Sequence, residues 1–462
     1  MFEFKTSIHA IPANQLYLYY IILVAMYLLF LRGIKLTYLT ATILLLFNQG
    51  FLTLAENVGP TISKVIFVYL ILVLLMRARI SGLTKNEQSA FLAFLAFTGL
   101  FFLNYIVNQV NIIWAFFQYY KYFFPVALYF AIKGLKLNSE GYSYYGQLII
   151  KLLWFQIAFS VTKLLVIGFR ENVIGSISNT GGGIGVGYAI LGTIMYWTMR
   201  GKNLQGKDWW FVLLLLIIPG ASNKRAIWFM YPIIIALLML NGIDRKTLRK
   251  ISTIIMLVPI IIYVGFRLNP TLNPEKQLWG SFDIEYALDY ALSYSGASEE
   301  KLSGEYAQGR FGASSAIIIT IIKDPFSLDA LLGVSRSRMG RMGDDFNPED
   351  YGLLEGTMTS SIGYMSVQMG WLATLLIISV FFRLIYTIPD RKIAGIIAFY
   401  VLWDLVLYSG QTINGTIQSV LLILSIHIIK HYSVKSDNSG TNQGSSDSIV
   451  SGIPAVASVR VR

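Results

Sequence analysis

The stretch "PGASNKRAIWFMYP", Pro219 to Pro232, sets two adjacent basic residues, Lys224 and Arg225, between two apolar runs. These runs extend from Trp209 to Ile218 and from Ile233 to Leu240. Similar runs recur along nearly the whole chain, and they are continuous rather than alternating, which indicates membrane-spanning helices and not strands. We therefore expect an all-α fold, a polytopic integral membrane bundle.

The composition excludes several classes of protein. Of 462 residues, 55% are hydrophobic and 13% charged, whereas soluble proteins carry roughly 25% charged residues. The chain has no cysteine, which excludes disulfides, thiolate nucleophiles and zinc–thiolate sites. His9 lies far from His427 and His431, so we predict no metal ligands. We attribute the net charge of +12 to cytoplasmic loops rather than to nucleic-acid binding.

Hydropathy predicts about thirteen spanning segments. They are 15–32, 36–55, 61–78, 89–107, 110–132, 145–168, 183–199, 208–221, 226–242, 251–267, 359–382, 393–409 and 415–430. Because 208–221 is short, 208–242 is either a broken pair or one bent unit, which leaves about twelve spans as the alternative. No short apolar region with a cleavage site precedes the first segment, so we expect a retained helix.

Basic residues predict the orientation, because they gather in one set of alternate loops. These are Arg32, Lys35, Arg77, Arg79, Lys85, Lys133, Lys136, Arg200, Lys202, Lys207, Arg245, Lys246, Arg249, Lys250, Arg383, Arg391, Lys392, Lys430 and Lys435. By the positive-inside rule this face is cytoplasmic. The opposite loops are short except for 169–185 and 269–357.

These patterns divide the chain into four parts. We expect N-terminal transmembrane helices over 1–268, a long extracytoplasmic loop over 269–358 and C-terminal transmembrane helices over 359–432. The remainder, 433–462, is rich in Ser, Gly and Asn and is predicted to be a disordered cytoplasmic tail.

The long loop contains an apolar run, Ala313 to Pro325, that predicts a helix. Its isoleucines at 317, 318, 321 and 322 fall on one predicted helical face, and Asp324-Pro325 closes the segment. The run is too short to span a bilayer, so we expect it to lie at the membrane interface or on the bundle. A long loop with its own amphipathic structure is more often functional than passive.

Several basic side chains fall on the predicted outer side, where they are normally scarce. They are Arg170, Lys224, Arg225, Arg310, Arg336, Arg338 and Arg341. Arginine grips phosphate oxygens with two parallel hydrogen bonds, so such a cluster suits a diphosphate at headgroup level. The alternative for any one of them is a solvated loop residue. Arg225 is the strongest candidate, because a charge between two apolar segments needs a partner.

Three other features are candidate parts of a site. Lys121, in "FFQYYKYFFP", either binds an anion or has a snorkelling or paired structural role. The glycines from 181 to 187 either supply amide donors to an anion or allow close helix packing. A loop carboxylate is expected to act as the base for an attacking hydroxyl, and Glu305 is the candidate among several acidic residues on this side.

Two motifs on these outer loops resemble the O-antigen polymerase and ligase superfamily, which includes Wzy-type polymerases. "SNKRAIW" partly matches the family's first motif through Ser222, Arg225 and Ala226, with two residues inserted. "GRFGASSAIIITIIKDPFSLDALLGV" matches the long-loop pattern well, and "LEGTMTSSIGYMSVQMGWLATLLI" is similar to the segment that re-enters the membrane. The resemblance covers roughly 210–385.

The Arg-x10-Gly pairs, Arg170 with Gly181 and Arg341 with Gly352, are similar to elements of some polymerases. One difference matters, because ligases carry a histidine where this chain reads "GTMTSSIGYM". The absence of that histidine favours a polymerase over a ligase.

The resemblance implies a membrane glycosyltransferase of the bacterial cytoplasmic membrane that polymerises undecaprenyl-pyrophosphate-linked repeat units into O-antigen, capsule or exopolysaccharide. Arg225, Arg310 and Glu305 would be catalytic, and Arg170, Lys224, Arg338, Arg341 and Lys121 would bind substrate. No cofactor is implied. The expected partners are the lipid-linked oligosaccharide, membrane lipids, a chain-length regulator and a flippase. The alternatives are a flippase-type transporter, a ligase and, ranked last, a scaffold protein.

Overall fold

The computed structural model describes most of the chain between 21 and 441. The described residues are 21, 24, 25, 27–30, 34–49, 59–109, 111–168, 173–177, 183–201, 204, 206–240, 245–270, 272–295, 309–333, 359–408, 412, 413 and 415–441. They form helices and contain no strand, so the predicted all-α class is confirmed for this part of the chain.

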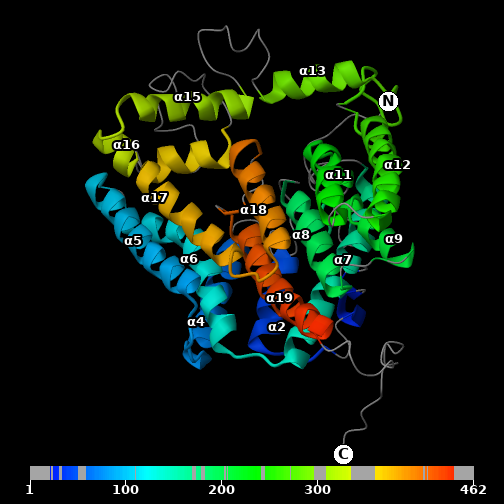
Figure 1. Cartoon of the computed structure of the whole chain (residues 1–462). Coiled ribbons are helices and arrows are strands. Elements are labelled where there is room, and N and C mark those ends of the chain that lie inside the picture. The colour runs from blue at the N-terminus through cyan, green and yellow to red at the C-terminus, as the bar shows by residue number, and fades with distance from the viewer. Residues whose placement is uncertain are drawn as a thin grey trace, which may run out of the picture.

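Most of the described helices fall within the predicted apolar segments and follow their order (Figure 1). The segment expected at 15–32 lies mainly outside the described residues, and three further helices belong to the long loop of 269–358. The described helices are α2 (Tyr38–Phe47), α4 (Gly59–Arg77), α5 (Lys85–Val107), α6 (Ile112–Gly134), α7 (Ser139–Ile167), α8 (Gly183–Met199), α9 (Gly206–Leu214), α10 (Ile217–Ala221), α11 (Ala226–Met239), α12 (Arg245–Leu268), α13 (Ile284–Ser295), α15 (Gly309–Lys323), α16 (Leu328–Leu332), α17 (Ser361–Ile385), α18 (Arg391–Val406) and α19 (Thr416–Thr441).

Four of the described helices are long and apolar enough to cross a membrane: Lys85–Val107, Ser139–Leu165, Ser361–Ile385 and Thr416–Val434. The shorter apolar helices include α2, α8 and α11. The segment expected at 208–221 is broken, because α9 ends at Leu214 and α10 is a single turn before α11. The structure therefore favours a broken unit over one bent helix in 208–242.

One predicted boundary and one predicted helix face need correction. The sequence predicts that the C-terminal tail begins at 433, but α19 continues to Thr441, and 442–462 lie outside the described residues. In α15, Ile317 is buried against Val367, whereas Ile322 is 68% exposed. The isoleucines therefore do not all face the bundle. The buried face of α15 consists of Ala313, Ile317 and Ile321, which recur every fourth residue. Ile322 lies outside this face.

The basic loops meet at one end of the bundle, as their alternation predicts. The N–H of Arg79 donates to the carbonyl of Gly134 (2.9 Å), which joins the α4–α5 connection to the end of α6. The side chain of Asn86 donates to the carbonyl of Tyr386 (3.3 Å), which joins the start of α5 to the α17–α18 turn. Helices α13 and α15 lie across the opposite end (Figure 1).

Helix α17 is not one straight span, as predicted for 359–382, but bends at Gly370, where φ is 77°. The bend allows α16 to pack against it. A Cβ on Gly370 would lie 2.1 Å from the carbonyl oxygen of Leu331, and one on Gly333 would lie 2.5 Å from the backbone nitrogen of Gly370. Only glycine tolerates this backbone angle and this approach together. The first half of α17, Ser361 to Met369, is thereby turned toward α15.

Candidate functional site

The connection between α10 and α11 is a tight turn that presents the basic pair of the central motif. The N–H of Asn223 donates to the carbonyl of Gly220 (2.9 Å), and that of Lys224 donates to the carbonyl of Pro219 (3.1 Å). Asn223 has a left-handed backbone (φ 57°), which asparagine adopts more readily than most residues. The chain reverses within this turn, and Arg225 becomes the N-cap residue of α11.

Arg225 is half-buried under an element of the long loop. Its guanidinium carbon lies 4.5 Å from the ring centroid of Tyr290 on α13, within the range of a cation–π interaction. The positive end of the α11 dipole adds to the guanidinium charge. The position therefore favours an anion, and the long loop folds over it.

An apolar cavity of about 300 Å³ adjoins this turn. Its walls come from α7, α9, α10, α11 and α12, and they include Gly220, Ala221 and Trp228. Gly220 and Ala221 directly precede the turn that carries Lys224 and Arg225. A basic turn thus borders a cavity lined almost wholly by apolar side chains, an arrangement that suits a ligand with an anionic head and an apolar tail.

Arg310 lies in the first turn of α15, at the same end of the bundle. Its guanidinium carbon is 5.5 Å from the ring centroid of Tyr408, which follows α18. One turn further along α15, the hydroxyls of Ser314 and Ser360 are 2.7 Å apart, and the N–H of Ser360 donates to Ser314 (2.8 Å). These bonds fix the start of α15 against the start of α17.

Lys121 lies on α6, where it faces the first half of α17. Its ammonium nitrogen is 5.3 Å from the ring centroid of Tyr122 and 5.2 Å from that of Tyr364. Both distances allow cation–π contact. The lysine therefore sits at the contact between α6 and α17, among aromatic side chains.

The other predicted site residues, Glu305, Arg170, Arg338 and Arg341, lie outside the described residues. Of the predicted set, the structure describes Lys121, Lys224, Arg225 and Arg310. It places Arg225 and Arg310 on elements at the same end of the bundle, each with a tyrosine ring over its guanidinium group.

The described glycines of the Gly181–Gly187 run serve close packing. A Cβ on Gly187 would lie 2.7 Å from Nε2 of Gln418 on α19, and one on Gly185 would lie 3.3 Å from Cα of Pro219 on α10. Of the two interpretations of this run, contact between helices accounts for these two positions.

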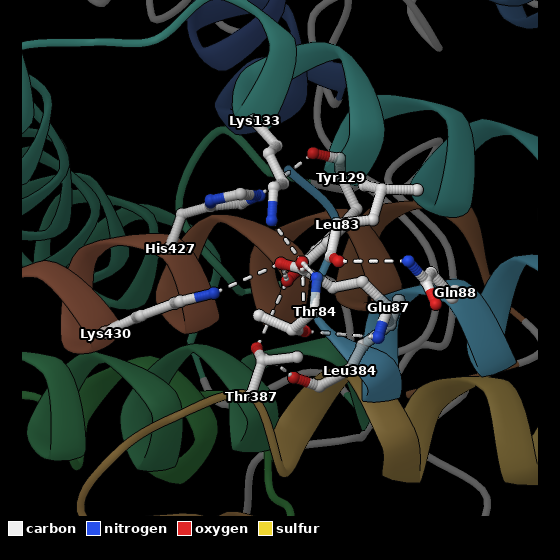
Figure 2. Close-up of polar contacts among 10 residues, drawn as sticks. All are labelled: Leu83, Thr84, Glu87, Gln88, Tyr129, Lys133, Leu384, Thr387, His427 and Lys430. Atoms are coloured by element: carbon white, nitrogen blue, oxygen red, sulfur yellow. Dashed lines mark hydrogen bonds and ion pairs between the residues drawn. The ribbon is translucent and has the colours of Figure 1, made fainter. Parts of the chain in front are cut away.

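A buried carboxylate at the basic end was not predicted as a site. Glu87, in the first turn of α5, has no exposed side-chain surface and lies between Lys133 of α6 and Lys430 of α19 (Figure 2). Its Oε1 accepts from the hydroxyl of Tyr129 (2.8 Å) and from Nζ of Lys430 (3.1 Å). Its Oε2 accepts from Lys133 and from the N–H of Thr84 (2.7 Å).

This cluster joins the basic ends of three helices and the α17–α18 turn. The Tyr129 hydroxyl also lies 3.1 Å from the hydroxyl of Thr387, which follows α17. Thr84 and Glu87 form a capping box, and the pattern Thr-x-x-Glu before an apolar run is a sequence signal for one. That signal predicts the cap, whereas the two lysines come from distant parts of the chain.

Together, the described helices define an all-helical protein with several helices of membrane-spanning length and composition. Comparison with family models, curated proteins and solved structures finds no match for this chain. Any assignment of function therefore depends on the motifs and on the geometry of the basic turn.

Proposed function

We propose that this protein is a polymerase of the bacterial cytoplasmic membrane that joins undecaprenyl-pyrophosphate-linked oligosaccharide units into a surface polysaccharide. The observation that carries the proposal is the apolar cavity beside the turn of Lys224 and Arg225. A polyprenyl diphosphate has the two parts that this arrangement suits. Its apolar chain matches the cavity, and its diphosphate matches the basic turn at the N-terminus of α11.

In the long loop, Arg310 supplies a second guanidinium group for the proposed diphosphate site. It begins α15 at the end of the bundle that α13 crosses, so its charge and the α15 dipole add to those of Arg225. Two guanidinium groups in a partly dry site stabilise the negative charge that develops on a departing diphosphate. The proposed substrate-binding set is completed by Lys121, Lys224 and the loop arginines Arg170, Arg338 and Arg341.

The reaction transfers the glycan of one lipid-linked unit to another. A hydroxyl of the acceptor glycan attacks the anomeric carbon of the donor glycan, and the bond from that carbon to the diphosphate oxygen breaks. The diphosphate lipid leaves with the electron pair of that bond. The hydroxyl proton passes to a carboxylate, for which Glu305 is our candidate. The donor bond is already activated, so no nucleotide sugar is needed.

A flippase-type transporter is the rival function, because ionisable residues lie deep in two apolar helices. Lys163 of α7 is 2% exposed and Asp404 of α18 is fully buried, with its Oδ2 accepting from the N–H of Thr412 (2.8 Å). Charges within spanning segments often mark transport pathways. A test must therefore separate loss of polymerisation from loss of transport.

The Arg310→Ala variant in cells separates the two functions. We expect polymer to disappear while single lipid-linked repeat units still reach the outer leaflet, because removing the guanidinium group affects the joining step and not transport. Periplasmic exposure of the units is measured by their digestion with an added glycosidase in spheroplasts. Units that stay inside the cell would support the flippase, and polymer of normal length would contradict both roles for Arg310.

A further inference from the structure

Four large apolar side chains are exposed where the long-loop helices α15 and α16 meet. Ile319 and Ile322 are three residues apart on α15 and share one face of it, Phe326 lies in the turn after α15, and Leu328 begins α16. Their exposed fractions are 53%, 68%, 80% and 67%. We call these four residues the α15–α16 edge. Exposed apolar residues that gather in this way, unlike single ones, mark contact with another surface.

Contacts with α17 hold the α15–α16 edge outward. The buried face of α15 packs against Val367 of α17. The indole N–H of Trp371 on α17 donates to the carbonyl of Pro325 in the turn (2.9 Å), and Gly333 at the end of α16 lies against the backbone of Gly370. The edge cannot rotate into the bundle without breaking these contacts, so its exposure is a fixed property of the fold.

The neighbouring helix α5 carries an exposed apolar stripe along most of its length. The stripe consists of Leu92, Leu95, Gly99, Leu103 and Ile106, which are all exposed. They recur every three or four residues and therefore share one face, while the opposite face of α5 is buried in the bundle. Because α5 is long and apolar enough to cross a membrane, this stripe is the face that contacts lipid in a spanning helix.

The α15–α16 edge adjoins the end of this stripe. Helix α16 packs against α5, and the side chain of Asn108, the residue that caps the end of α5, donates to the carbonyl of Gly333 at the end of α16 (3.2 Å). Helix α16 has only five residues, about 7.5 Å of helix, so Leu328 lies close to the end of α5 (Figure 1). The apolar surface of α5 therefore continues onto the edge.

Charged side chains beside the edge indicate the depth at which it lies. Lys323, Asp324 and Asp329 are exposed among its apolar members. Charged groups are costly in the hydrocarbon core. At the boundary between headgroups and acyl chains, by contrast, apolar groups enter the lipid while charged groups stay hydrated. Trp371, which binds the turn, is a residue type enriched at that boundary. The composition of the edge therefore suits a lipid surface at headgroup level.

We infer that the α15–α16 edge inserts into the headgroup–acyl boundary of the adjacent membrane leaflet and anchors the long loop there. The anchor does not depend on the proposed function, but its consequence for Arg310 does. Helix α15 lies across the end of the bundle (Figure 1), and Arg310 is in its first turn. An anchor at the other end of α15 therefore holds Arg310 near headgroup level, where the diphosphate of the proposed substrate lies.

Spin-label accessibility tests the anchor in nanodiscs of phosphatidylethanolamine and phosphatidylglycerol. The chain has no native cysteine, so the full-length protein takes a single nitroxide at Ile322→Cys or Phe326→Cys. Oxygen concentrates in lipid and a hydrophilic nickel chelate stays in water, so the ratio of the two accessibilities reports lipid contact. We expect this ratio at both positions to be several-fold higher than at Gln277→Cys, in the exposed connection after α12. The lipid-facing control is Leu103→Cys, on the stripe of α5.

Three results would overturn the anchor. Ratios at the edge equal to that at Gln277→Cys would place it in water. Low accessibility to both reagents would show that protein, such as a second copy of the chain, covers it. A water-like ratio at Leu103→Cys would remove the lipid-facing surface that the edge continues. Lipid-like ratios at the edge together with normal polymer in Arg310→Ala would reject the proposed function and leave the anchor standing, whereas water-like ratios with loss of polymer would do the reverse.

Discussion

Replacing Arg225 with alanine is expected to slow the joining of lipid-linked repeat units by about 10²- to 10³-fold, the effect of removing one fixed donor from a site of developing charge. Arg225 is half-buried at the N-terminus of α11, and its guanidinium group lies against the ring of Tyr290. Burial lowers the effective dielectric around such a charge, so its loss is only partly compensated by solvent. The measurement is chain growth by purified full-length protein in nanodiscs, with lipid-linked units from the native cell.

The Arg225→Lys variant sharpens this prediction. Lysine keeps the charge but lacks the planar fork that binds two phosphate oxygens at once, so we expect a rate between those of wild type and Arg225→Ala. The control is Arg79→Ala, because Arg79 is exposed at the basic end of the bundle. Normal chain growth by Arg225→Ala would contradict the proposed role, whereas equal losses in Arg225→Ala and Arg79→Ala would indicate a non-specific charge effect.

The second large effect is on stability. Replacing Glu87 with alanine is expected to lower the free energy of unfolding by about 3–5 kcal/mol, the usual result of removing one member of a buried ion pair. The side chains of Lys133 and Lys430 are only 18% and 27% exposed, so neither ammonium group is fully hydrated once the carboxylate is gone. Tyr129 also loses its acceptor.

Denaturant titration of the protein in detergent, followed by tryptophan fluorescence, measures this change. The matched control is Glu140→Ala, because Glu140 also lies in the first turn of a long apolar helix but is exposed. Its removal is expected to cost about 1 kcal/mol or less, the range of a surface charge near a helix N-terminus. Equal stability of the Glu87→Ala variant and the wild type would show that the Figure 2 cluster does not hold these helices together.

The sequence predicts the helices well, because a continuous apolar run has few alternatives when a chain carries so little charge. It also predicts which loops share an end, since helices of similar length that follow one another must alternate in direction. The bend at Gly370 is different, because nothing in "VQMGWLATL" distinguishes it from an uninterrupted apolar helix. Its left-handed backbone is set by the approach of α16, which is a tertiary contact.

The sequence likewise predicts some residues of the candidate site but not the contacts that these residues make. Residue type and position in the chain are enough to single out Lys224, Arg225 and Arg310. The tyrosine rings over the two arginines come from α13 and from the residues after α18, far away in sequence. The contact of Lys121 with Tyr364 likewise depends on how α6 and α17 pack, so helical periodicity gives the two faces but not their contact.

The proposed function is tested most directly by finding which side of the membrane the end with Arg225 and Arg310 faces. The chain has no native cysteine, so single cysteines report without background. Gln277 lies in the exposed connection after α12, and Ser81 is exposed at the basic end. With a membrane-impermeant maleimide on intact spheroplasts, we predict that Gln277→Cys is labelled and that Ser81→Cys is labelled only after lysis. Labelling of Ser81→Cys alone in intact spheroplasts would put Arg225 and Arg310 in the cytoplasm and contradict the proposal.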